Sequence, residues 1–495
     1  MKKLFPKFLA GAVIAGLSLT ASAEQLDHFI INGQSLSTGH QSWPVVSTEN
    51  VPGNFMLGNQ IWNNYGHDWE AAMHPLIGTV AKQFQNDGGN GTKDGGAIAE
   101  CPLLGAVNHL QLKYGTHKIL ASSVGVSGAA VEELSKECET RTHYKDFQRT
   151  LTNAKTAVAG TDYQLNCPAI FWMQGEFNYS VKGEPCGLKP GEYNTTDKRT
   201  YRNLMVKLKE NMQHDIMEAY GQTKAPVWIT YQTGAQYVRD ELGIGMAQLE
   251  AANTHDDIIM AGPVYPMTDR GGHLDANGYR WFGEMLAKVY YKTQVLGEKF
   301  LGLQPMKITR EDGGKTIRVK FTVPEGALVF DTKTLPKVKN YGFNVYHNGY
   351  GNAGKQNIKT ITIDGDDVVM TFDNALTGKV FVTYGDPTAY IDTPVSGKND
   401  LKGHGNLRDS DPYEGVLEYI DLDKKDGNGD YVYMHKEGHT LRPDFEPMDE
   451  EGNVIYGKKY PLYNFAVSFY YQLREGVDEL VILDENGNAV IDPNE

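Results

Sequence analysis

Short apolar runs alternate with longer amphipathic stretches through the first 300 residues. Between the runs, apolar side chains recur at helical spacing, as at Tyr201, Leu204, Leu208, Met212 and Ile216. Alternating strands and helices predict an α/β domain in which helices cover both faces of a parallel sheet. The runs that we interpret as buried strands are residues 29–31, 119–121, 169–172, 227–229 and 258–260.

After about Gly302 the pattern changes to the two-residue alternation of exposed strands. Because a single core rarely exceeds ~300 residues, we expect an α/β domain at 24–302 and a β-rich, sandwich-like accessory domain at 303–495. The polar, Gly-rich stretch 390–415 is expected to be a surface loop. Strands are predicted at 316–321, 368–372, 379–383 and 465–469.

The N-terminal segment has the pattern of a secretory signal. Lys2, Lys3 and Lys7 precede an apolar run at 8–19, which is followed by Ala-Ser-Ala at 21–23. We therefore expect a signal peptide at 1–23 and export of the mature chain to the periplasm or the medium. No later segment is apolar for long enough to predict a transmembrane helix.

Charge and cysteine content narrow the class of protein. A formal net charge of −15 disfavours nucleic acid and anionic lipid as partners. Four cysteines in an exported chain favour two disulfides, with the pairing left open although 167 with 186 would close a short loop. Zinc is disfavoured because no Cys-x-x-Cys pair is present. The cysteines are Cys101, Cys138, Cys167 and Cys186.

A candidate nucleophile follows the first predicted strand. The strand at 28–32 runs directly into Gly33, Gln34 and Ser35, and glycine permits the sharp turn that presents a serine hydroxyl. In isolation, the same pattern also describes an ordinary turn with a helix N-cap.

Polar groups also follow the next two strands. Gly128 lies in the turn after the second strand, where its N–H can stabilise an oxyanion, although a plain strand-to-helix turn has the same pattern. Gln174 and Glu176 follow the third strand. Gln174 is a candidate third oxyanion donor, and Glu176 either supports the site or forms a purely structural ion pair.

The last predicted strand is followed by a loop that carries a histidine and carboxylates. His273 can accept the proton of Ser35 if Asp269 holds its other ring nitrogen. Asp275 is better interpreted as the N-cap of the final helix. We interpret His40, His67, His74 and His255 as ordinary surface or core residues.

In chain order, these motifs resemble the SGNH hydrolase superfamily, and within it the sialate O-acetylesterase-like carbohydrate esterases. The resemblance covers about residues 25–291. The resemblance implies a flavodoxin-like, three-layer fold in which Ser35 is the nucleophile, His273 the base and Asp269 its partner. It also implies an oxyanion hole from the N–H groups of Ser35 and Gly128 with Gln174. The matching blocks are 33–35, 126–136, 172–176 and 273–279.

Two positions depart from that family pattern. One extra residue separates Asp269 from His273, and Leu36 follows Ser35 where asparagine is common. If Asp269 does not reach His273, Glu176 or a backbone carbonyl is the alternative that orients the ring.

Two further patterns concern the C-terminal half. Residues 421–430 are rich in Asp, as calcium loops are, but their spacing differs from that of an EF-hand and favours a hairpin turn. The C-terminal half is also rich in tyrosines, which can stack on sugar rings or simply pack in a core. They are Tyr341, Tyr346, Tyr350, Tyr390, Tyr433, Tyr460 and Tyr463.

These observations favour an exported serine esterase that removes O-acetyl groups from a glycan or another small ester, without metal or cofactor. Two alternatives remain open at this level: a lipase or longer-chain esterase, and a non-catalytic glycan-binding protein or adhesin. The sequence carries no signal for an oligomeric state.

Overall fold

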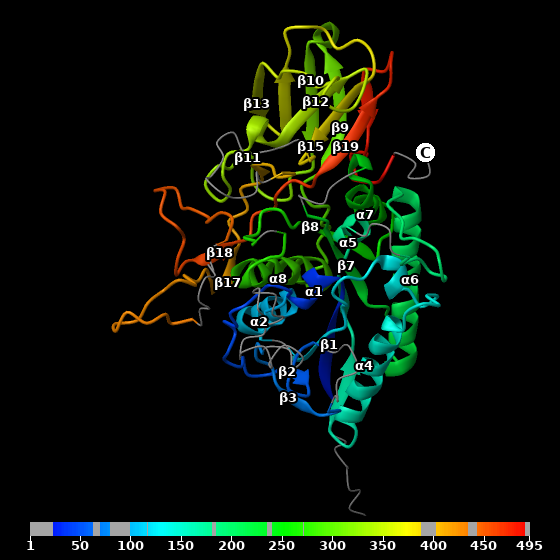
Figure 1. Ribbon diagram of the computed structural model, residues 1–495, viewed down its shortest axis with the longest axis vertical. Helices are drawn as coiled ribbons and strands as arrows, with labels where there is room; N and C mark the ends of the chain where they lie inside the picture. The colour runs from blue at the N-terminus through cyan, green and yellow to red at the C-terminus, as the bar shows by residue number, and fades with distance from the viewer. Residues whose placement is uncertain are drawn as a thin grey trace, which may run out of the picture.

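The computed structural model of the chain describes residues 23–62, 70–79, 100–115, 117–180, 185–234, 240–270, 272–387, 402–433 and 443–490 (Figure 1). Residues 1–22 of the expected signal peptide lie outside this part, as do His67 and Tyr390.

The α/β region is built around one mixed sheet with strand order β3-β2-β4-β1-β6-β7-β8, and β5 also pairs with β1. All pairs are parallel except β2 with β3. The five predicted apolar strands are confirmed as β1, β4, β6, β7 and β8. The strands are β1 (Glu24–Gly33), β2 (Asn54–Leu57), β3 (Met73–Pro75), β4 (Lys118–Ser123), β5 (Tyr163–Asn166), β6 (Ala169–Met173), β7 (Val227–Gln232) and β8 (Ile258–Pro263).

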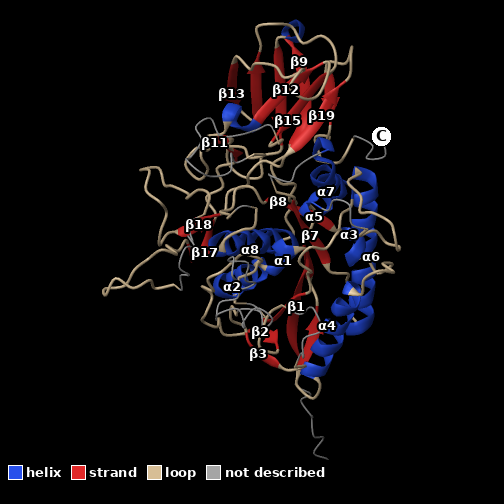
Figure 2. Cartoon of the chain, viewed as in Figure 1, coloured by secondary structure: helices blue, strands red, loops and turns tan. Residues whose placement is uncertain are grey.

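Helices cover both faces of this sheet (Figure 2). Helices α2 and α8 pack on one face, and α3, α4, α6 and α7 pack on the other. No helix among the described residues is long and apolar enough to cross a membrane. The helices are α1 (Ser35–Thr38), α2 (Pro102–Tyr114), α3 (Val131–Leu134), α4 (His143–Val158), α5 (Glu176–Ser180), α6 (Lys198–Tyr220), α7 (Gly243–Thr254) and α8 (Ala276–Tyr290), with short helical turns at Asp240–Leu242 and Tyr291–Val295.

The β-rich region contains antiparallel sheets of orders β13-β14-β10-β9-β20 and β12-β15-β19, and two-stranded pairs β11-β16 and β17-β18. The predicted strand at 465–469 begins later, at Phe469. The strands of the β-rich region are β9 (Pro305–Glu311), β10 (Thr316–Phe321), β11 (Val329–Phe330), β12 (Phe343–His347), β13 (Thr360–Asp364), β14 (Asp367–Thr371), β15 (Val380–Tyr384), β16 (Leu407–Arg408), β17 (Glu414–Glu418), β18 (Lys459–Pro461), β19 (Phe469–Leu473) and β20 (Glu479–Val481). Short helical turns lie at Asp312–Gly314 and Lys339–Gly342.

The C-terminal half also returns to the α/β region. Tyr419, Tyr460 and Leu462 share a buried cluster with α2 and α8. The Lys288 ammonium on α8 forms a fully buried ion pair with Asp411, at 2.6 Å. Residues after 302 therefore pack against α2 and α8.

Two expectations for loops have different outcomes. The expected surface loop 390–415 is wrong over its described part, because residues 403–409 are buried and include β16. Asn406 holds that segment through hydrogen bonds from its amide to Asp331 O (2.7 Å) and Pro336 O (3.0 Å). In the stretch 421–430, Asp426 N donates to Asp430 O (2.8 Å), as the hairpin interpretation requires.

Candidate active site

Ser35 is the first residue of α1, directly after the central strand β1. Gly33 has a φ of 146°, and a Cβ at this position would lie 2.0 Å from Met173 O on β6. Only glycine therefore lets β1 approach β6 this closely and then turn. Because Ser35 lies in the first turn of α1, its N–H has no earlier helical carbonyl to bind and can serve a ligand.

His273 meets Ser35 from the loop between β8 and α8. Its Nε2 lies 2.8 Å from Ser35 Oγ. Burial, and secondarily the charge of His40, lowers the pKa of His273 to about 3. The ring is therefore neutral at ordinary pH, as a base that accepts the serine proton must be.

The other ring nitrogen of His273 contacts Gln41. The distance from His273 Nδ1 to Gln41 Oε1 is 2.8 Å. A carbonyl oxygen only accepts hydrogen bonds, so Nδ1 carries the hydrogen and Nε2 presents its lone pair to Ser35. Sequence reasoning missed Gln41, because no motif marks it.

In the structure the His273 ring is hydrogen-bonded to Gln41 and Ser35, and not to Asp269, the partner that the resemblance implies. Asp269 instead forms an antiparallel backbone bridge with Leu274, and its carbonyl accepts from Asp444 N at 2.8 Å. This backbone pairing closes the turn, and Nδ1 of His273 faces the segment after α1. The interpretation of Asp275 as a helix cap is confirmed, since its Oδ1 accepts from Gly278 N at 2.7 Å.

Gly128 lies on the loop after β4, which packs against the β1–α1 turn. Val126 N donates to Gly33 O (2.9 Å), and the hydroxyls of Ser127 and Thr38 are 3.2 Å apart. Gly128 has a φ of 72°, and only the ring of Phe177 would come within 4 Å of an added Cβ. The loop that carries Gly128 therefore borders the Ser35 turn, and the space beside Gly128 is open on that side.

Gln174 is fully buried, and its amide is occupied. Its Nε2 donates to Asn178 Oδ1 (2.6 Å) and Ala129 O (3.2 Å), and Tyr201 OH donates to its Oε1 (2.8 Å). Both amide hydrogens therefore have protein partners. Use of Gln174 as an oxyanion donor requires one of those bonds to open.

Gln34 differs from Gln174 because its amide hydrogens are not donated to protein acceptors among the described residues. Its Oε1 accepts from Gly175 N (3.1 Å) and Phe177 N (2.8 Å), which fixes the amide orientation. In the described part of the chain, its Nε2 has no hydrogen-bond acceptor. Gln34 lies within the Gly-Gln-Ser motif. Its position directly before the candidate nucleophile Ser35 is the sequence signal that could have identified it.

The Glu176 carboxylate is not hydrogen-bonded to His273. Its carboxylate accepts from Gly234 N (2.6 Å) and from Tyr231 OH, and burial raises its pKa. Glu176 thus ties the end of β6 to the end of β7. It supports the edge of the sheet on which the candidate site lies.

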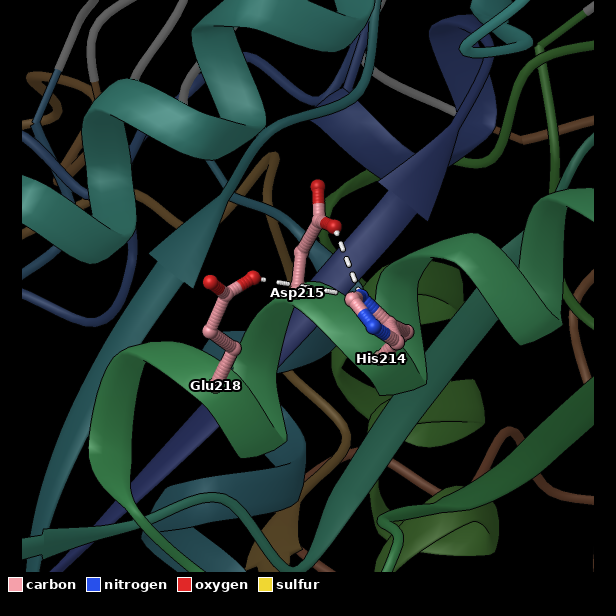
Figure 3. Close-up of side chains that lie close together, drawn as sticks. All are labelled: His214, Asp215 and Glu218. Atoms are coloured by element: carbon pink, nitrogen blue, oxygen red, sulfur yellow. Dashed lines mark hydrogen bonds and ion pairs between the residues drawn. The ribbon is translucent and has the colours of Figure 1, made fainter.

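One cluster on α6 has metal-ligand chemistry but an occupied carboxylate. His214, Asp215 and Glu218 point toward one another (Figure 3). The Asp215 carboxylate already accepts from Lys136 Nζ (2.7 Å) and Tyr144 OH (3.1 Å). These bonds favour a structural role in packing α6 against α3 and α4.

The structure holds all four cysteines as free thiols, so the two expected disulfides are not supported. Cys101 packs on the α2/α8 face of the sheet, whereas Cys138 follows α3 on the opposite face. Cys167 and Cys186 lie beyond opposite ends of β6, a strand about 17 Å long. Disulfide-bonded residues need Cα atoms within about 7 Å.

No protein-family model and no curated protein matched the chain. Solved structures that it resembles include a carbohydrate acetylesterase from Xanthomonas citri, at 14% identity, 77% coverage of each chain and a TM-score of 0.46. An Arabidopsis thaliana protein matches at 15% identity, over 55% of this chain and 98% of that one, with a TM-score of 0.36. A family two carbohydrate esterase from Clostridium thermocellum matches at 8% identity, over 54% and 65%, with a TM-score of 0.29.

Proposed function

We propose that the protein is a serine esterase that removes acetyl groups from a carbohydrate through an acyl-Ser35 intermediate. The observation that carries this proposal is the 2.8 Å contact between His273 Nε2 and Ser35 Oγ, with Nδ1 of the same ring on a hydrogen-bond acceptor. A base held in this tautomer beside a serine is the arrangement that nucleophilic acyl transfer needs.

In the proposed reaction, His273 takes the Ser35 proton while Oγ attacks the ester carbonyl. The N–H groups of Ser35 and Gly128, with the free amide of Gln34, are the donors available to the developing oxyanion. Collapse expels the sugar alcohol, which receives the proton from His273. Water then attacks the acyl-enzyme by the same route in reverse and releases acetate.

Covalent labelling tests this proposal directly. A fluorophosphonate probe should label the native protein at Ser35, and Ser35→Ala should abolish both labelling and release of p-nitrophenol from its acetate. Ser37→Ala is the matched control, because Ser37 is a second buried serine on α1 and its removal should leave labelling at Ser35 unchanged. Labelling at another residue, or full activity in a folded Ser35→Ala variant, would refute the assignment.

A groove of about 1240 Å³ supports a carbohydrate as the substrate. It lies where the starts of α6 and α7 meet β19 and β20. Aromatic rings pack against the apolar faces of sugars, and charged groups hydrogen-bond to sugar hydroxyls. The groove offers both, through Tyr350, Tyr470, Tyr471, Asp197, Lys198, Glu241 and Arg474.

The strand order relates this groove to Ser35. Helix α7 follows β7, and β7 is two strands from β1 in the sheet. Parallel strands end at one edge, so the start of α7, which lines the groove, lies toward the edge that carries Ser35.

Substitution of a groove tyrosine separates sugar binding from ester chemistry. Tyr350 is 37% exposed, and Tyr350→Ala should lower kcat/KM on acetylated xylan without changing turnover of p-nitrophenyl acetate. Tyr431→Ala is the control, since Tyr431 is 48% exposed elsewhere. Equal losses on both substrates, or none, would contradict a role in carbohydrate binding.

Acyl-chain length distinguishes an acetylesterase from a lipase. Turnover of nitrophenyl esters should fall from acetate to longer acyl chains, and a rise with length would favour the lipase alternative. Glycan binding with no ester turnover and no labelling would favour a non-catalytic glycan-binding protein or adhesin.

We extend the proposal to location, with action in the periplasm or the medium. The basic, apolar and small-residue pattern at 1–23 supports export. Expression in a bacterial host followed by N-terminal sequencing should give a periplasmic or secreted chain that begins at Glu24. An unprocessed chain retained in the cytoplasm would contradict this part of the proposal.

A further inference from the structure

The position beside His273 that usually holds a carboxylate is occupied by a neutral amide. In serine hydrolases an aspartate or glutamate normally accepts from Nδ1 of the catalytic histidine. Here the acceptor is Gln41 Oε1, at 2.8 Å. Among the described residues, no carboxylate is hydrogen-bonded to the His273 ring.

We propose that Gln41 is the positioning residue of the active site, and that it orients His273 through an uncharged hydrogen bond in place of the triad acid. This inference rests on the esterase function proposed above. During attack the proton moves from Ser35 Oγ to His273 Nε2, while the Nδ1 hydrogen stays on the ring and remains donated to Gln41. The amide therefore fixes the tautomer without itself gaining or losing a proton.

The segment that carries Gln41 is built to reach the ring. Gly39 ends α1 with a φ of 82°, where a Cβ would lie 1.6 Å from Glu100 O. Gln41 itself has a φ of 63°, a left-handed conformation that is strained for a residue with a Cβ. Surrounding contacts must hold such a residue in place.

Arg270 supplies those contacts and links Gln41 to the histidine loop. Its Nη2 donates to Gln41 O (2.5 Å) and to Trp43 O, and its backbone N donates to His273 O (2.9 Å). One residue therefore holds the backbones of both hydrogen-bond partners. This clamp compensates for the left-handed turn and fixes the amide relative to the ring.

Burial and the neighbouring His40 both disfavour protonation of His273 and so lower its pKa. The His40 ring packs edge-on against it, with centroids 4.8 Å apart, and the Arg270 guanidinium adds positive charge on the same loop. Asp275 binds Thr268 and the N-terminus of α8, and Tyr279 donates to His40 O. A carboxylate in place of the Gln41 amide would add the stabilising charge that the imidazolium lacks.

The sign of the pH effect follows from the low pKa of His273. A base whose pKa is lowered stays neutral, and so competent, as the pH falls well below 6.5. The acid limb of kcat/KM should therefore lie below pH 5. A charged acceptor would raise the pKa of the ring and move that limb upward.

The test compares Gln41→Glu and Gln41→Ala with the native enzyme. Gln41→Glu should move the acid limb of kcat/KM upward by about 1–3 pH units. Gln41→Ala should lower kcat at least about tenfold with little change in KM, because the tautomer is no longer held. Gln60→Ala, which removes another buried glutamine amide, is the control and should leave the limb in place. Native kinetics in Gln41→Ala, or an unmoved limb in Gln41→Glu, would overturn the proposal.

A titration of His273 by nuclear magnetic resonance separates this inference from the esterase proposal, because it needs no turnover. The native ring should remain neutral at pH 5, and Gln41→Glu should raise its pKa. A native His273 that is charged at pH 6 would overturn the role of Gln41. Failure of Ser35 labelling with normal titrations would instead refute the esterase function and leave the hydrogen-bond assignment intact.

Discussion

The substitution Gly33→Ala tests how rigidly the strand pair positions the candidate nucleophile. An added Cβ would lie 2.0 Å from Met173 O, whereas real Cβ contacts are essentially never below 3.0 Å. The strands must therefore separate by about 1 Å. That shift breaks the hydrogen bond from Gln34 N to Met173 O, now 2.9 Å long.

Two costs add at this position. The φ of 146° is strained for alanine, at about 1–3 kcal/mol, and overpacking against a backbone carbonyl costs about 1–3 kcal/mol. We expect a loss of about 2–6 kcal/mol in the free energy of unfolding. Because Ser35 is two residues away, a shift of 1 Å should also lower kcat about a hundredfold.

Urea unfolding and ester turnover measure these two effects. Gly160→Ala is the matched control, because Gly160 also has a positive φ, of 77°, but nothing lies within 4 Å of the added Cβ. It isolates the backbone strain from the clash. If Gly33→Ala proved no more destabilising than Gly160→Ala and kept full activity, the reasoning about the close approach of β1 and β6 would be refuted.

Three further predictions concern the oxyanion donors, the thiols and the core. Gln34→Ala should lower kcat on p-nitrophenyl acetate about a hundredfold with KM nearly unchanged, and an unchanged kcat would remove Gln34 from the oxyanion hole. Burial raises the pKa of Cys101 to about 12 and also raises that of Cys167. An aromatic disulfide reagent should therefore not react with Cys101 or Cys167 in the native protein. After denaturation it should react with all four thiols, and reaction with only two would indicate a disulfide. Lys288→Met should lower stability to urea by about 3–5 kcal/mol, since it leaves Asp411 charged and buried, and a loss below 1 kcal/mol would contradict that.

The sequence pattern predicted the strands because their apolar residues are buried on both faces of the sheet. Ile30 and Ile31 pack on opposite faces, and so do Phe171 and Trp172. Ser35 and His273 could be predicted together for the same reason. Each follows a strand that the pattern locates, and parallel strands bring their carboxyl ends to one edge.

The partner of His273 could not be predicted in this way. Asp269 is near His273 in the sequence, but in the structure His273 Nδ1 is hydrogen-bonded to Gln41. Gln41 reaches the ring only because of a left-handed backbone and the Arg270 clamp. Neither feature leaves a periodic or compositional signal.

The two glutamines of the site show that residue type alone does not assign an oxyanion donor. Gln174 and Gln34 both follow strands that end at the same edge, and both are buried. They differ in the acceptors around their amide nitrogens: Gln174 Nε2 donates to Asn178 and Ala129, whereas Gln34 uses only its oxygen, which accepts from Gly175 N and Phe177 N. An amide whose oxygen is fixed and whose hydrogens are unclaimed is already oriented to donate, and it breaks no protein bond when an oxyanion forms. On this physical criterion Gln34 is the better donor, even though the family resemblance points to Gln174.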